Sequence, residues 1–148
     1  MGDVRVTYFA FHYTDIWKVN QIRNSDQFIS RLAAGFKDGS LWEEARRKGD
    51  AAIKRMIDEG LQGTSVTICL IGQLTAYREY VAYELEQSYK RGNLVFGIHL
   101  HNQRFGQGPV PALLRQNNAV VYQPWDSKAP LGRYIEDAEA KTLGQARR

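Results

Sequence analysis

The segment that most constrains the fold of this chain is the six-residue run VTICLI at positions 66–71. A strand with one face in water alternates apolar and polar residues, whereas this run is almost wholly apolar. Such a run is typical of a central strand that is buried on both faces. We therefore predict a sheet that is covered by helices on both sides, with residues 66–71 at its centre.

Other stretches of the sequence fit the same alternation of strands and helices. Further strands are predicted at residues 4–11, 94–100 and 119–122, with residues 27–29 as a candidate edge strand. Helices are predicted from Asp15 onward and over residues 41–59, 75–91 and 131–143, and residues 101–118 are expected to form a long loop. This order predicts an α/β fold with a five-stranded, mainly parallel sheet in one domain, residues 1–148.

The second helical region has local signals at both of its ends. Ser40 and Glu43 fit a capping box, in which each side chain satisfies a backbone amide of the other residue. Asp50, directly after Gly49, is an alternative start of the helix. Gly60 is expected to end it, because glycine is a poor helix former.

Composition excludes several classes of protein. The chain has 148 residues, of which 43% are hydrophobic and 24% are charged, as in ordinary globular domains. The net charge is +4, but the basic residues are dispersed, so nucleic-acid binding is not expected. Cys69 is the single cysteine, so no internal disulfide can form. Because we find neither a membrane-length apolar run nor a signal peptide, we expect a cytoplasmic protein that does not bind membranes.

A candidate ligand site lies where the first and third predicted strands end. In open parallel sheets, ligands bind beyond the carboxyl ends of the strands, at the point where the strand order reverses. Phe11, His12 and Tyr13 follow the first strand, and Gly72 and Thr75 follow the third. Aromatic rings, hydroxyls and a glycine that permits close backbone approach suit a nucleotide or another flat, sugar-bearing ligand.

One acid on the helix predicted at residues 75–91 has an unusual position. The side of this helix that faces the sheet carries residues at helical spacing: Tyr77, Val81, Leu85 and Ser88. Glu84 borders that side, whereas Glu79 and Glu86 point to solvent. A carboxylate beside an apolar stripe is costly unless it is paired or used. A salt bridge with Arg78 or Lys90, or exposure at the edge of the stripe, is the alternative explanation.

Other residues with possible chemistry have structural explanations as well. His99 and His101 lie on one face of a strand, but with His12 they form no evident metal-binding set, so we predict no metal site and expect solvent-facing or loop histidines. Cys69 is expected to be a small buried hydrophobe. Trp42 is either a hydrophobic residue at a helix start or a wall on which a base stacks. Neither a dinucleotide-binding GxGxxG motif after a strand nor a Walker loop is present.

Four stretches resemble the TIR-like proteins of the Thoeris antiphage system, which are relatives of Toll/interleukin-1 receptor domains. They are FAFHYTD at 9–15, RNS at 23–25, AAGFKDGSLWEEARRKGDAAIKRMIDEGLQGTSVTICLIG at 33–72 and TAYREYVAYELEQSYKRGNLVFGIHLHN at 75–102. The resemblance implies a flavodoxin-like, three-layer fold. The catalytic motif of these enzymes is Trp/Tyr-Val-x-x-Glu-Leu/Ile, which here is residues 80–85. The match to this motif implies that Glu84 is the catalytic residue, although a tyrosine replaces the commoner tryptophan at position 80.

The resemblance also implies an activity. TIR enzymes cleave NAD between nicotinamide and ribose, so NAD is expected as a substrate, with no cofactor. Thoeris-type relatives make a cyclic ADP-ribose isomer that activates a separate effector, and a phage-derived trigger is part of this expectation. TIR folds also assemble through protein contacts, which leaves open a homo-oligomer and, as the alternative function, a non-catalytic nucleotide-binding or adaptor module.

The expected site joins these two lines of reasoning. We expect Glu84 in a pocket with the loop at residues 11–15 and with at least one of Asn24, Trp42 and Thr75. Phe36 joins Phe11, Tyr13 and Trp42 as an aromatic residue that can exclude water from the reaction.

Overall fold

The computed structural model describes residues 6–23, 30–31, 40–124 and 131–146, and its strands form one sheet. The strands are β1 (Thr7–Ala10), β2 (Ser30–Arg31), β3 (Val66–Ile71), β4 (Leu94–His99) and β5 (Val121–Tyr122), in the order β2-β1-β3-β4-β5. Every neighbouring pair is parallel. β3 lies at the centre and all six of its residues are buried. The expected α/β fold with a parallel sheet around residues 66–71 is therefore confirmed, although β2 and β5 have only two residues each.

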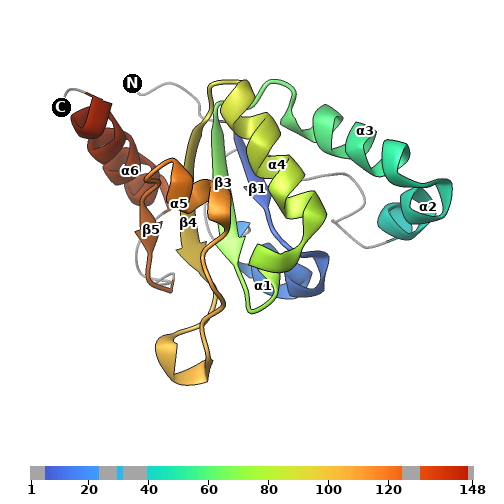
Figure 1. Ribbon diagram of the computed structural model, residues 1–148, viewed down its shortest axis with the longest axis horizontal. Coiled ribbons are helices and arrows are strands. Elements are labelled where there is room, and N and C mark those ends of the chain that lie inside the picture. The colour runs from blue at the N-terminus through green and yellow to red at the C-terminus, as the bar shows by residue number, and fades with distance from the viewer. Residues whose placement is uncertain (1–5, 24–29, 32–39, 125–130, 147–148) are drawn as a thin grey trace.

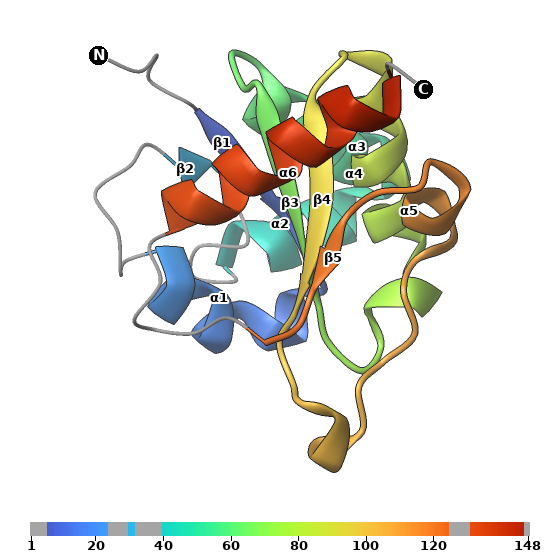
Figure 2. The same cartoon turned by 90° about the vertical axis from the view of Figure 1, so that its left-hand side faces the viewer.

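Helices cover the sheet on both sides (Figure 1). They are α1 (Ile16–Arg23), α2 (Ser40–Lys48), α3 (Asp50–Leu61), α4 (Glu79–Lys90), α5 (Ala112–Gln116) and α6 (Leu131–Ala146). Figure 2 shows α6 in front of the sheet and α3 and α4 behind it, and α2 packs against α3. No described helix is long and apolar enough to span a membrane.

The edges of the sheet differ in detail from the expectation. β5 is shorter than the predicted strand at 119–122, and β1 ends at Ala10 rather than at residue 11. Residues 4 and 5 and the candidate edge strand at 27–29 lie outside the described residues. The strand that pairs with the outer side of β1 is β2.

The helical region predicted at 41–59 is two helices, because the chain turns at Gly49. Gly49 has a φ of 105°, a conformation that residues with a side chain rarely adopt. Ser40 and Asp50 are therefore both helix starts. The prediction that Gly60 ends the second helix is wrong, because α3 continues through Leu61, whose side chain is buried. One glycine inside a helix costs only about 1 kcal/mol, which the burial of Leu61 offsets.

The helix predicted at 75–91 is interrupted at Arg78. A short 3₁₀ turn, η3 (Thr75–Tyr77), is followed by Arg78 in an extended conformation, and α4 then begins at Glu79. Tyr77 was expected on the side that faces the sheet, and this prediction is wrong: its side chain is 71% exposed. Val81, Leu85 and Ser88 are buried as predicted.

The segment 101–118 is not only a loop, because it contains the short helix α5. This helix starts directly after Pro111, and its Leu114 is fully buried. Proline is compatible with the start of a helix, since its missing N–H has no partner there. α5 supplies the crossover that two parallel strands, β4 and β5, require.

Candidate active site at the carboxyl edge of the sheet

The loops that follow β1 and β3 meet at the carboxyl edge of the sheet, as the sequence predicts. A Cβ atom on Gly72 would lie 2.2 Å from Oδ2 of Asp15, so the two loops are in direct contact. The backbone N–H of Gly72 donates a hydrogen bond of 2.7 Å to Oγ1 of Thr75, whose side chain is fully buried. The loop after β4 also reaches this point, because a Cβ atom on Gly108 would lie 2.2 Å from the carbonyl oxygen of Gly72.

Charged and titratable side chains surround this junction. Burial raises the pKa of Asp15, while His12, His101 and Lys18 act in the opposite direction. Burial and the nearby Arg78 lower the pKa of His12, so its imidazole is neutral at physiological pH. Nζ of Lys18 lies 3.2 Å from Nδ1 of His101. A neutral imidazole, a carboxyl group and two cations therefore lie around the ends of β1 and β3.

A hollow of about 120 Å³ opens at the same edge. Its walls are formed by Lys18, Gln21, Ile22, His99 and Leu100. Glu84 is not among these residues, so the expected pocket that joins Glu84 to residues 11–15 stays a prediction.

Glu84 lies inside the protein rather than at the border of the apolar side of α4. Its exposed fraction is 0%, and its Oε2 accepts a hydrogen bond from the hydroxyl of Tyr8 on β1. Oε1 has no hydrogen-bond partner of normal geometry among the described residues. The alternative explanation that the Glu84 side chain is exposed at the edge of the apolar stripe is therefore wrong. An ion pair of Glu84 with Lys90 is also wrong, because Lys90 pairs with Glu86 at 3.0 Å. An ion pair with Arg78, the other alternative, is not found either, and no cation among the described residues acts on Glu84.

The environment of Glu84 has a strong effect on its protonation. Burial raises the pKa of the Glu84 carboxyl well above its usual range. The hydroxyl of Tyr8 and the backbone amide of Phe11 act against this rise, because both favour the charged form. The net effect is a raised pKa, and carboxyl groups whose pKa burial shifts in this way are common at catalytic positions.

A buried chain of hydroxyls fixes the backbone of α4 at the same residue. Oγ of Ser88 donates a hydrogen bond of 2.7 Å to the carbonyl oxygen of Glu84. Oγ1 of Thr67 on β3 donates to Oγ of Ser88 at 2.8 Å, and Nδ2 of Asn93 donates to Oγ1 of Thr67 at 3.1 Å. Glu84 is therefore tied to β1 through its side chain and to β3 through its backbone.

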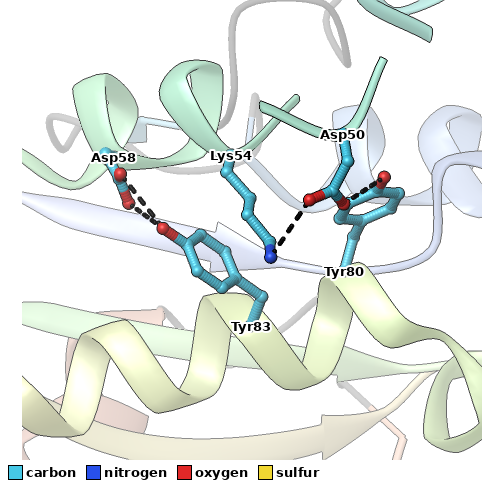
Figure 3. A network of polar contacts seen from close by, with 5 residues as sticks. All are labelled: Asp50, Lys54, Asp58, Tyr80 and Tyr83. Carbon is cyan, nitrogen blue, oxygen red and sulfur yellow. Dashed lines mark hydrogen bonds and ion pairs between the residues drawn. The ribbon is translucent and has the colours of Figure 1, made fainter. Parts of the chain in front are cut away.

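Two tyrosines of α4 join this helix to α3 in a polar seam (Figure 3). The hydroxyl of Tyr80 donates to Oδ1 of Asp50 at 2.8 Å, and that of Tyr83 donates to Oδ1 of Asp58 at 2.9 Å. Lys54 pairs with Asp50 at 3.1 Å, and its Nζ lies 5.2 Å from the centre of the Tyr83 ring. The tyrosine that replaces tryptophan in the motif thus contacts α3 through its hydroxyl.

The remaining predicted ligand-binding residues are placed to different degrees. Phe11 is buried and His12 is half-buried beside the junction. Tyr13 lies in the 3₁₀ turn η1 (Tyr13–Asp15), and Trp42 lies in α2, but only their backbones are described. Asn24 and Phe36 lie outside the described residues. The two explanations of Trp42 therefore both stay predictions.

The other histidines and the cysteine have partly different surroundings from those expected. His99 is only 6% exposed, so the expectation of a solvent-facing or loop position is wrong for it. Cys69 is a buried residue of β3, as predicted, and burial raises the pKa of its thiol. No cluster of histidine, cysteine and acidic side chains suited to a metal occurs within the residues that the structure describes.

Sequence reasoning missed Tyr8 and Lys18 as members of the site. Asp15 was expected beside the site as part of the loop at residues 11–15, without a role of its own, and Tyr8 was considered only as part of an apolar strand. The one available signal for Tyr8 was its hydroxyl, since a buried phenol usually requires a hydrogen-bond partner.

Comparisons with known proteins identify the family of this chain. The family model described as "Thoeris protein ThsB, TIR-like domain" matches residues 8–104, a range that contains Tyr8, the junction and all of α4. The chain is 42% identical over 115 residues to a Bacillus cereus (strain MSX-D12) protein named "Putative cyclic ADP-D-ribose synthase ThsB1". The match covers 70% of this chain and 59% of that relative, so the chain spans less than two thirds of the length of the curated protein. The resemblance and the TIR-like fold are thereby confirmed, and this chain belongs to the ThsB family of Thoeris TIR-like proteins.

Proposed function

We propose that this protein cleaves NAD at the bond between nicotinamide and ribose and makes a cyclic ADP-ribose isomer, with Glu84 as the catalytic carboxylate. The observation that carries the proposal is the position of Glu84: fully buried, held by Tyr8 and without a cation among the described residues. A buried carboxyl group without a cation destabilises a fold, so a structural role does not explain it. The name of the Bacillus cereus relative supports the class of product.

The chemistry needs few protein groups. The bond between C1′ of the ribose and the nicotinamide nitrogen breaks, and its electron pair leaves with neutral nicotinamide. The ribose then has the character of an oxocarbenium ion, as in glycoside cleavage. An ionised Glu84 stabilises this positive charge. A hydroxyl of the adenosine ribose then attacks C1′ and releases its proton, which closes the ring of the product.

Water competes with that hydroxyl, and its attack gives linear ADP-ribose. The carboxyl edge of the sheet, with Phe11, His12, Gly72 and Thr75, is the proposed place of substrate binding. Aromatic side chains there reduce access of water and favour the cyclic product. Tyr13, Asn24, Phe36 and Trp42 complete the proposed site. The product then acts on a separate effector after a phage-derived trigger.

The test is to follow NAD in lysates of phage-infected cells that produce the protein. We expect nicotinamide release together with a cyclic ADP-ribose isomer, resolved by chromatography and identified by mass spectrometry. If linear ADP-ribose is the main product, the proposed cleavage of NAD stands but the proposed cyclisation is wrong. NAD that stays intact at full protein expression would favour the alternative, a non-catalytic adaptor module.

A further inference from the structure

Tyr8 is a buried polar residue in the middle of an apolar strand. All four residues of β1 are buried, and the exposed fraction of Tyr8 is 0%. Tyr8 is paired in register with Thr67, which reaches Ser88 on α4, so Tyr8 lies on the face of the sheet that α4 covers. Phenylalanine would satisfy this position as a core residue, and the hydroxyl of Tyr8 therefore requires a separate explanation.

The partner of that hydroxyl lies 76 residues away in the sequence. It is Oε2 of Glu84, which is equally buried. A hydrogen bond from a neutral donor to an ionised acceptor is stronger than one between two neutral groups. A phenol is neutral at physiological pH, so it can stabilise an ionised carboxyl without bringing a second charge into the core.

We propose that Tyr8 is a positioning residue that holds the Glu84 carboxyl in place and favours its ionised form, which catalysis requires. This inference rests on the proposed function. It adds that the hydrogen bond from Tyr8 to Glu84 sets the pH range of the reaction. Without the Tyr8 hydroxyl, burial raises the pKa of Glu84 further, so the ionised form is reached only at a higher pH. A protonated carboxyl cannot stabilise the positive charge that develops on the ribose.

The other groups around Glu84 do not replace Tyr8. On β3, burial and the nearby Glu84 raise the pKa of the Cys69 thiol, so this thiol stays neutral and brings no charge to Glu84. The backbone amide of Phe11 favours the ionised form but is common to any residue at that position. On α3, the charged side chains Asp50, Lys54 and Asp58 interact at the outer seam with one another or with Tyr80 and Tyr83. The Tyr8 hydroxyl is therefore the side-chain donor on which the ionisation of Glu84 depends.

The test is the pH dependence of nicotinamide release by Tyr8→Phe, which removes only one oxygen. We expect the acidic limb of kcat/KM to move upward by about one to two pH units, the shift that corresponds to one hydrogen bond to a charged group. Activity should recover to within about threefold of wild type on the alkaline side. Site-specific 3-fluorotyrosine at position 8, a stronger donor of equal shape, should move the limb in the opposite direction.

Thr67→Val is the matched control, since it also removes one buried hydroxyl beneath α4. That hydroxyl bonds to Ser88 rather than to the carboxyl of Glu84. We expect it to lower the thermal midpoint but to leave the acidic limb in place. An equal loss of activity at every pH in Tyr8→Phe, with no movement of the limb, would overturn the proposal in favour of a packing role for Tyr8.

A second readout separates this inference from the proposed function, because it needs no activity. Tyr8→Phe should lower the thermal midpoint more at pH 8 than at pH 5, since only the ionised form of Glu84 requires the donor strongly. In a Glu84→Gln background this pH dependence should vanish. If it persists there, Tyr8 does not act through Glu84. If it vanishes as expected while NAD stays intact, the proposed function fails and the coupling between the two residues stands.

Discussion

Asp15 and Gly72 are so close together that one additional methyl group does not fit between them. A Cβ atom on Gly72 would lie 2.2 Å from Oδ2 and 2.9 Å from Cγ of Asp15. The glycine after β3 was expected to let a ligand approach the backbone. In the structure the approaching group is a carboxyl group of the protein itself, which lies against the backbone of Gly72.

Gly72→Ala should therefore displace the carboxyl group of Asp15. We expect a loss of about 1–3 kcal/mol in the free energy of unfolding, the usual cost of overpacking. Nicotinamide release should fall at least about tenfold, as small displacements of binding groups do to catalysis. Chemical denaturation and the NAD assay measure the two effects.

The matched control is Gly132→Ala in α6, where an added Cβ atom would meet nothing within 4 Å. It should leave stability unchanged or raise it by up to about 1 kcal/mol, since alanine favours helices. A Gly72→Ala variant as stable and active as this control would show that the contact between Asp15 and Gly72 is unimportant.

Thr75 is predicted to act through its hydroxyl, which accepts the N–H of Gly72. Thr75→Val should cost about 1–3 kcal/mol, because it leaves a buried donor without an acceptor. Thr75→Ser should restore most of that loss. Urea denaturation of the three proteins tests this, and equal destabilisation by valine and serine would instead assign the role of Thr75 to its methyl group.

Glu84→Gln should stabilise the protein, and more so at higher pH. Below the usual glutamate pKa of about 4.5, the carboxyl is protonated in both the folded and the unfolded state. Above it the unfolded chain loses the proton while burial retains it in the folded protein, so rising pH favours unfolding until the folded carboxyl ionises. We expect the gain in thermal midpoint to be at least about 2 °C larger at pH 8 than at pH 5.

For this pH effect the control is Glu86→Gln, which removes an exposed carboxylate on the same helix. Glu86 pairs with Lys90 in an i, i+4 arrangement, which is worth about 0.3–0.5 kcal/mol. Its effect on the midpoint should be small and of the opposite sign at both pH values. A Glu84→Gln variant that fails to fold would instead indicate that Glu84 is structural.

The seam between α3 and α4 should persist into alkaline solution. Burial and the bonds to Asp50 and Asp58 raise the pKa of Tyr80 and of Tyr83 to about 12. Because the folded values exceed the ordinary value of 10, the stabilisation is present below pH 10 and is lost toward pH 12. The measurement is an absorbance titration near 295 nm of wild type, Tyr80→Phe and Tyr83→Phe. Each variant should lack a tyrosine titration step near pH 12. If the missing step instead lies near pH 10, the prediction is contradicted.

The parts of the fold that the sequence predicts well are those set by local pattern. β3 has the predicted bounds 66–71, because a strand buried on both faces is almost wholly apolar and so stands out in the sequence. The break at Gly49 was visible only as two competing helix starts, since a capping signal does not reveal whether the preceding helix has ended. α5 was missed because the glycines and prolines around it dominate the pattern, although Leu114 is buried against the sheet.

The candidate site could be predicted only in part, for a similar reason. Helical spacing and the motif both selected Glu84, but spacing placed it at a border, whereas the structure buries it completely. Tyr77 was assigned to the same helix, and the interruption at Arg78 turns it to solvent. Tyr8 could not be predicted, because its bond to Glu84 joins residues 76 positions apart and leaves no trace in local periodicity.

The most direct test of catalysis by Glu84 compares wild type, Glu84→Gln and Glu86→Gln in triggered lysates at matched expression and pH. Glutamine keeps the size of glutamate and removes only its charge, so the comparison isolates electrostatic stabilisation. We expect Glu84→Gln to release nicotinamide from NAD about 10²–10³ times more slowly and Glu86→Gln to match wild type. A folded Glu84→Gln protein that makes the cyclic product at the wild-type rate would contradict the assignment.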